Sequence, residues 1–68
     1  MEYKFKQRLK ELRTEKELSI LELGKLVDVS DATICRWENG IHDIKGYELI
    51  KLAKALDVTT DYLLGLED

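Results

Sequence analysis

The sequence predicts an all-α fold of five short helices, and three observations support this prediction. Apolar residues recur every three or four positions along most of the chain, which is the period of a helix with one buried face. Serine or threonine stands just before several of these segments, where a hydroxyl group can cap a helix. The chain has no proline, a residue that interrupts helices. We therefore expect one compact domain over residues 1–68.

The first helix is expected from about Phe5 to Lys16, because Phe5, Leu9 and Leu12 lie on one face with charged residues between them. This segment is also the basic part of the chain. Residues 1–16 hold six basic and three acidic residues, whereas the remainder holds five basic and eleven acidic ones. The formal net charge of −3 argues mildly against nucleic acid as a partner, but binding depends on the local field at one face.

A second helix should begin after Ser19 and run to about Val27. Ser19 and Glu22 form the S-x-x-E pattern of a capping box, in which the hydroxyl accepts from one backbone N–H and the carboxylate from another. Asp28 then stands where a tight turn often requires left-handed backbone, which Asp adopts more easily than most residues but less easily than Gly.

Ser30 predicts the start of a third helix, and Asp31 follows in its first turn, where the helix dipole favours an acid. This helix should end at about Asn39, with Gly40 as the residue after the cap. Residues 41–45 are expected to form a loop.

A fourth helix is predicted from about Gly46, and Thr59 should cap a short fifth helix that ends at Gly65. The fourth helix is marked by its apolar residues, Leu49, Ile50, Leu52, Ala53 and Leu56.

The second and third helices with their connection fit the register of a helix-turn-helix motif. Gly24 is small where the two helices should approach most closely, and Asp28 occupies the turn. The positions that should face the core are apolar: Leu23, Val27, Val29, Ile34 and Trp37.

These residues are part of a wider resemblance that covers almost the whole chain. The segments that carry it are RLKELR at 8–13, LS at 18–19, VS at 29–30, TI at 33–34, RWENG at 36–40, LIKLAKAL at 49–56 and DYLLGLED at 61–68. In combination they resemble the DNA-binding domain of the phage repressor/Cro (XRE) family. The resemblance implies a compact, lambda-repressor-like fold and a transcriptional regulator, by implication a repressor, that binds double-stranded DNA as a homodimer on a palindromic operator.

The resemblance also implies that the third helix enters the major groove, with its first turn and the following turn facing the bases. In this sequence these positions are Asp31, Ala32, Thr33 and Arg36. Arginine can bond both acceptors of a guanine, Asp can accept from the amino group of a cytosine, and Ala can contact a thymine methyl group. For Asp31, dipole chemistry alone is an equally good explanation.

Other roles follow from the resemblance alone. Phosphate contacts are expected from Ser19, Ile20, Ser30, Asn39 and Lys45. A structural ion pair is expected between Arg13 and Glu38, and dimer contacts at Ile44 and Tyr47.

The chain departs from the family pattern at three places. It has Ile20 where members usually have Gln, and Asp28 where they usually have Gly. Many members carry basic residues and a proline after ENG, whereas this chain has the apolar and acidic residues 41–44. We expect weak phosphate contacts, and therefore DNA binding that is weak or depends strongly on dimerisation.

Other functional classes are disfavoured. The sequence has no nucleophile constellation and no His/Cys cluster, so we expect neither an enzyme nor a metal site, and no cofactor or small-molecule ligand. It has no membrane-spanning run, and its lone Cys35 fits a reducing cytoplasm. The alternative function is a protein-interaction module that has kept this fold. Several of the apolar residues Ile20, Leu21, Leu26, Ile41 and Ile44 are expected to face solvent. In this alternative, the acidic surface and the apolar second helix would bind a protein.

Overall fold

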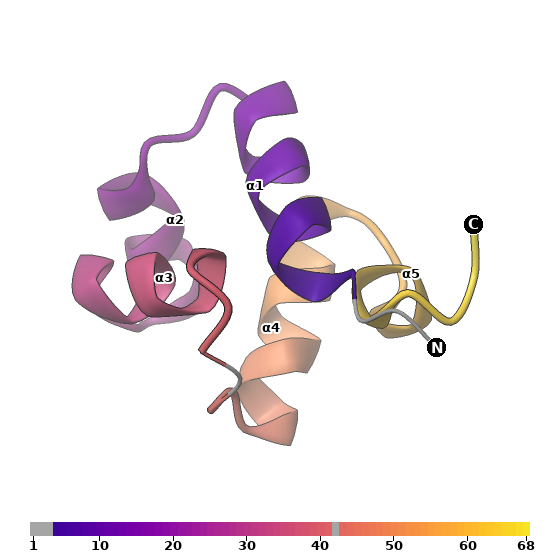
Figure 1. Ribbon diagram of the computed structural model, residues 1–68. Helices are drawn as coiled ribbons and strands as arrows, with labels where there is room; N and C mark the ends of the chain where they lie inside the picture. Colours follow the sequence, from indigo (N-terminus) through magenta and orange to yellow (C-terminus); the bar gives the residue numbers. More distant parts are fainter. Residues whose placement is uncertain (1–3, 42) are drawn as a thin grey trace.

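A computed structural model of the chain describes residues 4–41 and 43–68, and it contains five α-helices and no strand in these ranges (Figure 1). The helices are α1 (Phe5–Glu15), α2 (Ile20–Val27), α3 (Asp31–Glu38), α4 (Gly46–Leu56) and α5 (Thr60–Leu64). The predicted all-α, five-helix fold is confirmed, and each predicted helix end lies within one residue of the observed one. None of the helices described is long and apolar enough to cross a membrane.

Side-chain caps begin three of the helices at the predicted residues. The Ser19 hydroxyl accepts from the Glu22 N–H at 3.0 Å, and the Glu22 carboxylate accepts from the Ser19 N–H at 2.9 Å. This reciprocal pair is the predicted capping box. Ser30 and Thr59 cap α3 and α5 in the same way, each accepting from the N–H three residues later.

Left-handed residues end the helices and turn the chain sharply. Asp28 has a φ of 61° as predicted, and Gly40 and Gly65 also have positive φ. Glu17 and Asp57 adopt the same conformation at the ends of α1 and α4, which the sequence did not lead us to expect. Their short turns allow five helices to pack within 68 residues.

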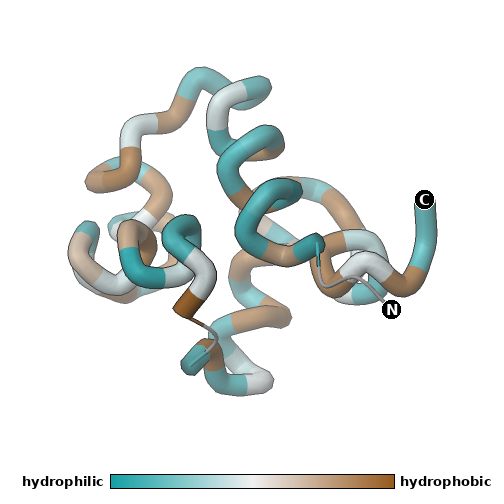
Figure 2. The backbone as a smooth tube through the Cα atoms, viewed as in Figure 1, coloured by the Kyte–Doolittle hydropathy of each residue, from teal (hydrophilic) through white to brown (hydrophobic). Residues whose placement is uncertain are grey.

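The helices bury one face each around a shared core, and the hydropathy along the tube alternates accordingly (Figure 2). Trp37 is at its centre with only 1% of its surface exposed, which confirms the prediction that it packs inside. The remaining core residues are Phe5, Leu9, Leu12, Leu23, Val27, Ile34, Leu52, Ala53, Leu56 and Leu63.

Gly24 sets the distance between α2 and the start of α3. A Cβ atom at this position would lie 2.7 Å from the Val29 carbonyl oxygen and 3.4 Å from the Ser30 carbonyl carbon. Any larger residue would therefore push the turn away from α2. The close approach predicted for Gly24 is present, and its neighbour is the backbone that leads into α3.

The apolar residues expected at the surface divide into two groups. Leu21, Leu26 and Ile41 are exposed, with 60% of Leu26 accessible to solvent. Ile20 and Ile44 are only half-exposed, because they pack against the core.

The turn at Asp28 generates a stability prediction. Replacing Asp28 by Gly should raise the free energy of unfolding by about 0.5–1 kcal/mol, because Gly adopts positive φ without the steric cost of a Cβ atom. Chemical denaturation followed by circular dichroism measures this difference. The matched control is Lys25→Gly at an exposed position inside α2, which should lower stability by about 1 kcal/mol. A loss of stability in Asp28→Gly would contradict the account.

Candidate nucleic-acid interface

The outward face of α3 presents the predicted base-contacting residues together. Asp31, Ala32, Cys35 and Arg36 are all exposed, and Thr33 is half-exposed beside them. They lie on one side of the helix because Ile34 and Trp37 on the other side are buried in the core. This face is therefore fixed by core packing, while its side chains remain accessible to a ligand.

Local hydrogen bonds order the first turn of this face. The Ser30 hydroxyl accepts from the Thr33 N–H at 3.1 Å and lies 2.9 Å from the Thr33 hydroxyl. The Asp31 carboxylate accepts from the Ala32 N–H at 2.9 Å. Asp31 thus has a local hydrogen-bonding role in the first turn without any ligand, and its place there agrees with the dipole explanation.

Arg36 has an acidic partner that the sequence did not predict. Its Nη2 atom donates to the Asp43 carboxylate at 3.2 Å, and both side chains are nearly half-exposed. The other oxygen of the same carboxylate accepts from the indole N–H of Trp37 at 2.9 Å. No sequence signal pointed to these bonds, because Asp43 lies in an irregular loop beyond a left-handed turn.

Most of the predicted phosphate-binding residues already have hydrogen-bond partners within the chain. The Ser19 N–H is bonded to the Glu22 carboxylate, so an anion would compete with an acid at that amide. The Asn39 amide group donates to the Cys35 carbonyl oxygen at 2.8 Å. Lys45 is exposed, and its backbone N–H donates to the Glu48 carboxylate at 2.9 Å.

The expected ion pair between Arg13 and Glu38 is present. The Nε atom of Arg13 lies 2.6 Å from Oε2 of Glu38, and its Nη2 atom lies 3.2 Å from Oε1. The hydrogen bond to Glu38 raises the pKa of the Arg13 guanidinium above its ordinary value. The third donor bond of Arg13 goes to the Leu18 carbonyl oxygen at 2.8 Å. Glu38 is thus engaged in holding α3 to α1.

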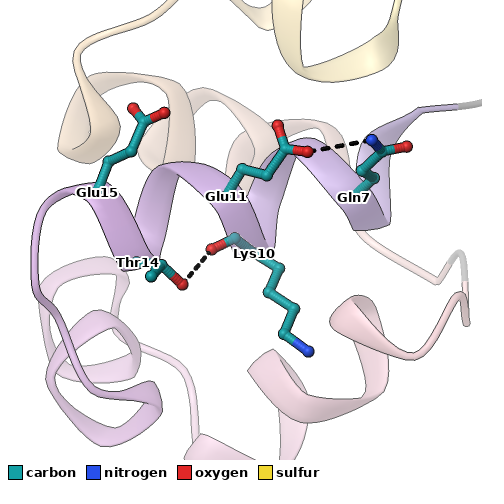
Figure 3. A pocket seen from close by; sticks show the side chains of 5 residues that line it. All are labelled: Gln7, Lys10, Glu11, Thr14 and Glu15. Carbon is teal, nitrogen blue, oxygen red and sulfur yellow. Dashed lines mark hydrogen bonds between the residues drawn. The ribbon is translucent and has the colours of Figure 1, made fainter.

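The exposed side of α1 forms an open hollow lined by Gln7, Lys10, Glu11, Thr14 and Glu15 (Figure 3). All five residues come from one helix, and they mix both signs of charge. In Figure 3 the Lys10 side chain extends away from Glu11 and Glu15. The hollow is open to solvent and does not indicate a catalytic site.

A comparison with protein families matches residues 9–63 to the helix-turn-helix family. The chain belongs to the helix-turn-helix family. This assignment agrees with the resemblance to phage repressors seen in the sequence, and the turn of the motif is the segment from Asp28 to Ser30 between α2 and α3.

Relatives of this helix-turn-helix domain include a phage repressor. The chain is 36% identical over 58 residues to repressor protein C2 of Salmonella phage P22, a match that covers 85% of this chain and 27% of the repressor. The chain therefore spans about a quarter of the length of that curated relative.

Solved structures show the same fold at nearly full coverage. The crystal structure of the P22 c2 repressor in complex with synthetic operator 9T matches with a TM-score of 0.88 and 33% identity, covering 93% of this chain and 96% of that one. The restriction-modification controller protein C.AhdI of Aeromonas hydrophila matches with a TM-score of 0.82 and 38% identity, covering 90% of this chain and 92% of that one.

Among the residues that the structure describes, no group of three or more His, Cys, Asp or Glu side chains could hold a metal ion. Cys35 is a free, exposed thiol beside Asn39. His42 lies outside the described residues.

The capping box of α2 predicts a pH dependence. Hydrogen bonds from the Ser19 backbone N–H, and secondarily from its side chain, lower the pKa of the Glu22 carboxyl below its ordinary value of 4.5. A depressed carboxyl pKa contributes stability above 4.5 that is lost as the pH falls through the folded-state value.

Wild type should therefore be more stable than Glu22→Gln at pH 7, and the difference should shrink as the pH falls below about 4.5. Thermal unfolding of both proteins across this range measures the difference. A gap that widens on acidification would contradict the capping assignment.

Proposed function

We propose that this helix-turn-helix domain is a sequence-specific double-stranded DNA-binding transcriptional regulator that acts as a repressor. Residues 1–68 act as one DNA-binding domain, and α3 reads the major groove. The observation that carries the proposal is the exposed polar face of α3, whose first turn is held by local hydrogen bonds. The helix-turn-helix family of the chain supports the same interpretation. We further propose that the protein is not an enzyme and that it acts in the cytoplasm, where a free thiol such as Cys35 stays reduced.

Base recognition is assigned to the outward face of α3. Arg36 can donate to both acceptors of a guanine, and Ala32 can contact a thymine methyl group. Thr33 and Asp31 lie in the first turn, where Asp31 can accept from a cytosine amino group. The exposure of these side chains and the rigid core behind them support the assignment.

Phosphate contacts are assigned to the residues flanking α3, and we propose that they are weak. The candidates are Ser19, Ile20, Ser30, Asn39 and Lys45. Glu22 competes for the Ser19 amide, so the contact at the start of α2 is less favourable than an open helix N-terminus would provide. Because phosphate contacts supply much of the affinity for DNA, binding should depend on low salt or on a dimer.

Selection of binders from random-sequence duplex DNA at low salt tests the function. Two enriched inverted half-sites with centres about 10 bp apart are expected for a dimer that reads successive major grooves. On the selected operator, Arg36→Ala should lose about 1–3 kcal/mol of binding free energy and the preference for one base pair.

The matched control for this variant is Lys54→Ala, which removes a positive charge from an exposed residue on α4. It should leave base preference unchanged. The proposal fails if no sequence is enriched by the wild-type protein, or if both variants bind the operator as wild type does.

We propose that the homodimer forms through Tyr47 in the first turn of α4 together with Ile44 in the loop before that helix. Tyr47 is 58% exposed, although it is a large aromatic side chain, and Lys51 lies over its ring at 5.6 Å. Ile44 also packs against the core, so a charged residue there would disturb the fold as well as an interface. Tyr47 is therefore the better position for a test.

Tyr47→Asp should shift the protein toward monomer in sedimentation velocity, because burying a carboxylate in an apolar contact is costly. Leu21→Asp makes a comparable change at an exposed position on α2 and should leave the dimer intact. Equal sedimentation of Tyr47→Asp and wild type would remove Tyr47 from the interface.

The exposed leucines of α2 favour a second candidate function, which is binding to another protein. Leu26 lines a shallow hollow with Ala55, Lys51 and Lys54, and such apolar surface is often an interaction site. Under this alternative, selection enriches no DNA sequence, and Arg36→Ala has no effect on partner binding while Leu26→Asp abolishes it.

A further inference from the structure

Asp43 forms hydrogen bonds with two residues of α3, the buried Trp37 and the exposed Arg36. One carboxylate oxygen accepts from the Trp37 indole N–H at 2.9 Å, and the other accepts from the Arg36 guanidinium at 3.2 Å. Trp37 is almost completely buried, so its N–H group has a fixed position. The carboxylate is consequently held at one end by the core and offers its other end to Arg36.

The backbone at the end of α3 brings Asp43 back over the helix. Gly40 has a φ of 92°, and its N–H donates to the Trp37 carbonyl oxygen at 3.2 Å. The Ile41 N–H donates to the Arg36 carbonyl oxygen at 3.0 Å. These two bonds form a Schellman motif, which fixes the direction in which the loop leaves α3. Asp43 is thus placed by two features that do not involve the Arg36 side chain, namely the turn and the Trp37 indole.

A guanidinium group has five N–H donors in a rigid plane, and Asp43 uses one of its two terminal nitrogens. Among the described residues no other side chain forms a hydrogen bond with this group. We propose that Asp43 is a specificity-determining positioning residue, which orients the Arg36 guanidinium so that its remaining donors meet a guanine. The proposal rests on the DNA-binding function proposed above and adds a residue outside the recognition helix to base reading.

The exposure of the pair explains why its effect should be on specificity more than on stability. An ion pair that is nearly half-exposed contributes little to folding, because water screens it. When a DNA groove covers the pair, the local dielectric constant falls and the attraction between the two charges strengthens. The orienting effect is therefore largest in the bound state. At the same time the carboxylate repels nearby phosphates, so Asp43 should lower affinity for DNA of any sequence.

Asp43→Asn separates these effects. Its side-chain oxygen can still accept from the Trp37 indole, whereas a neutral amide cannot pair with the Arg36 charge. On the operator selected with wild-type protein, we expect discrimination against replacement of the Arg36-dependent base pair to fall about tenfold. The variant should also bind a scrambled duplex more tightly than wild type does. The indole N–H resonance of Trp37 in the NMR spectrum, together with the thermal midpoint, reports whether the variant keeps the fold and the indole bond.

Asp57→Asn is the matched control, because it removes the same charge from an exposed residue in the turn after α4, where positive φ suits Asn. It should leave base discrimination at wild-type strength. If Asp43→Asn binds more tightly and discriminates as well as wild type, Asp43 merely competes with DNA for Arg36, and the proposal is overturned. Unchanged affinity and discrimination overturn it equally. If wild type itself shows no base preference, the proposed function fails first and this inference fails with it.

Discussion

The ion pair between Arg13 and Glu38 is the contact on which the position of α3 depends. Only 14% of the Arg13 side chain and 8% of the Glu38 side chain are exposed, and Arg13 also bonds the Leu18 carbonyl oxygen. One guanidinium thus joins α1, the α1–α2 connection and the last turn of α3. Loss of either partner would leave a charge largely shielded from water without compensation, which is costly. The position of the outward face of α3 is consequently fixed by Arg13 and Glu38, which are themselves largely shielded from solvent.

The acidic character of the chain is compatible with this arrangement, because three of the acids in or near α3 have structural partners. Glu38 is paired with Arg13, Glu22 closes the capping box of α2, and Asp31 accepts from an amide in the first turn of α3. Each carboxylate stabilises an element of the helix-turn-helix motif at some cost in attraction for phosphate. Under the proposed function, α3 can still recognise bases while the phosphate contacts contribute less to affinity.

Local chemistry explains which features could be predicted from the sequence. Helix starts depend on a hydroxyl and a nearby amide, so Ser19, Ser30 and Thr59 were sufficient to locate three of them. Contacts made across the fold were harder to predict. The Gly40 signal predicted the turn after α3 but not which side chains a residue three positions beyond it would contact, so the two bonds of Asp43 could not be predicted; the left-handed Glu17 has no side-chain signature. The sequence also suggested both a carboxylate and a phosphate at the Ser19 amide, and the structure shows the Glu22 carboxylate bonded there.

Backbone amide shifts of ¹⁵N-labelled protein, followed by NMR during titration with the selected duplex, test the central claim most directly. The account predicts that the largest changes occur from Ser30 to Arg36, with smaller changes at Ile20, Asn39 and Lys45. A scrambled duplex should produce weaker changes that disappear with added salt. The account is contradicted if the duplex changes the amide shifts of other surfaces while those of α3 stay unchanged.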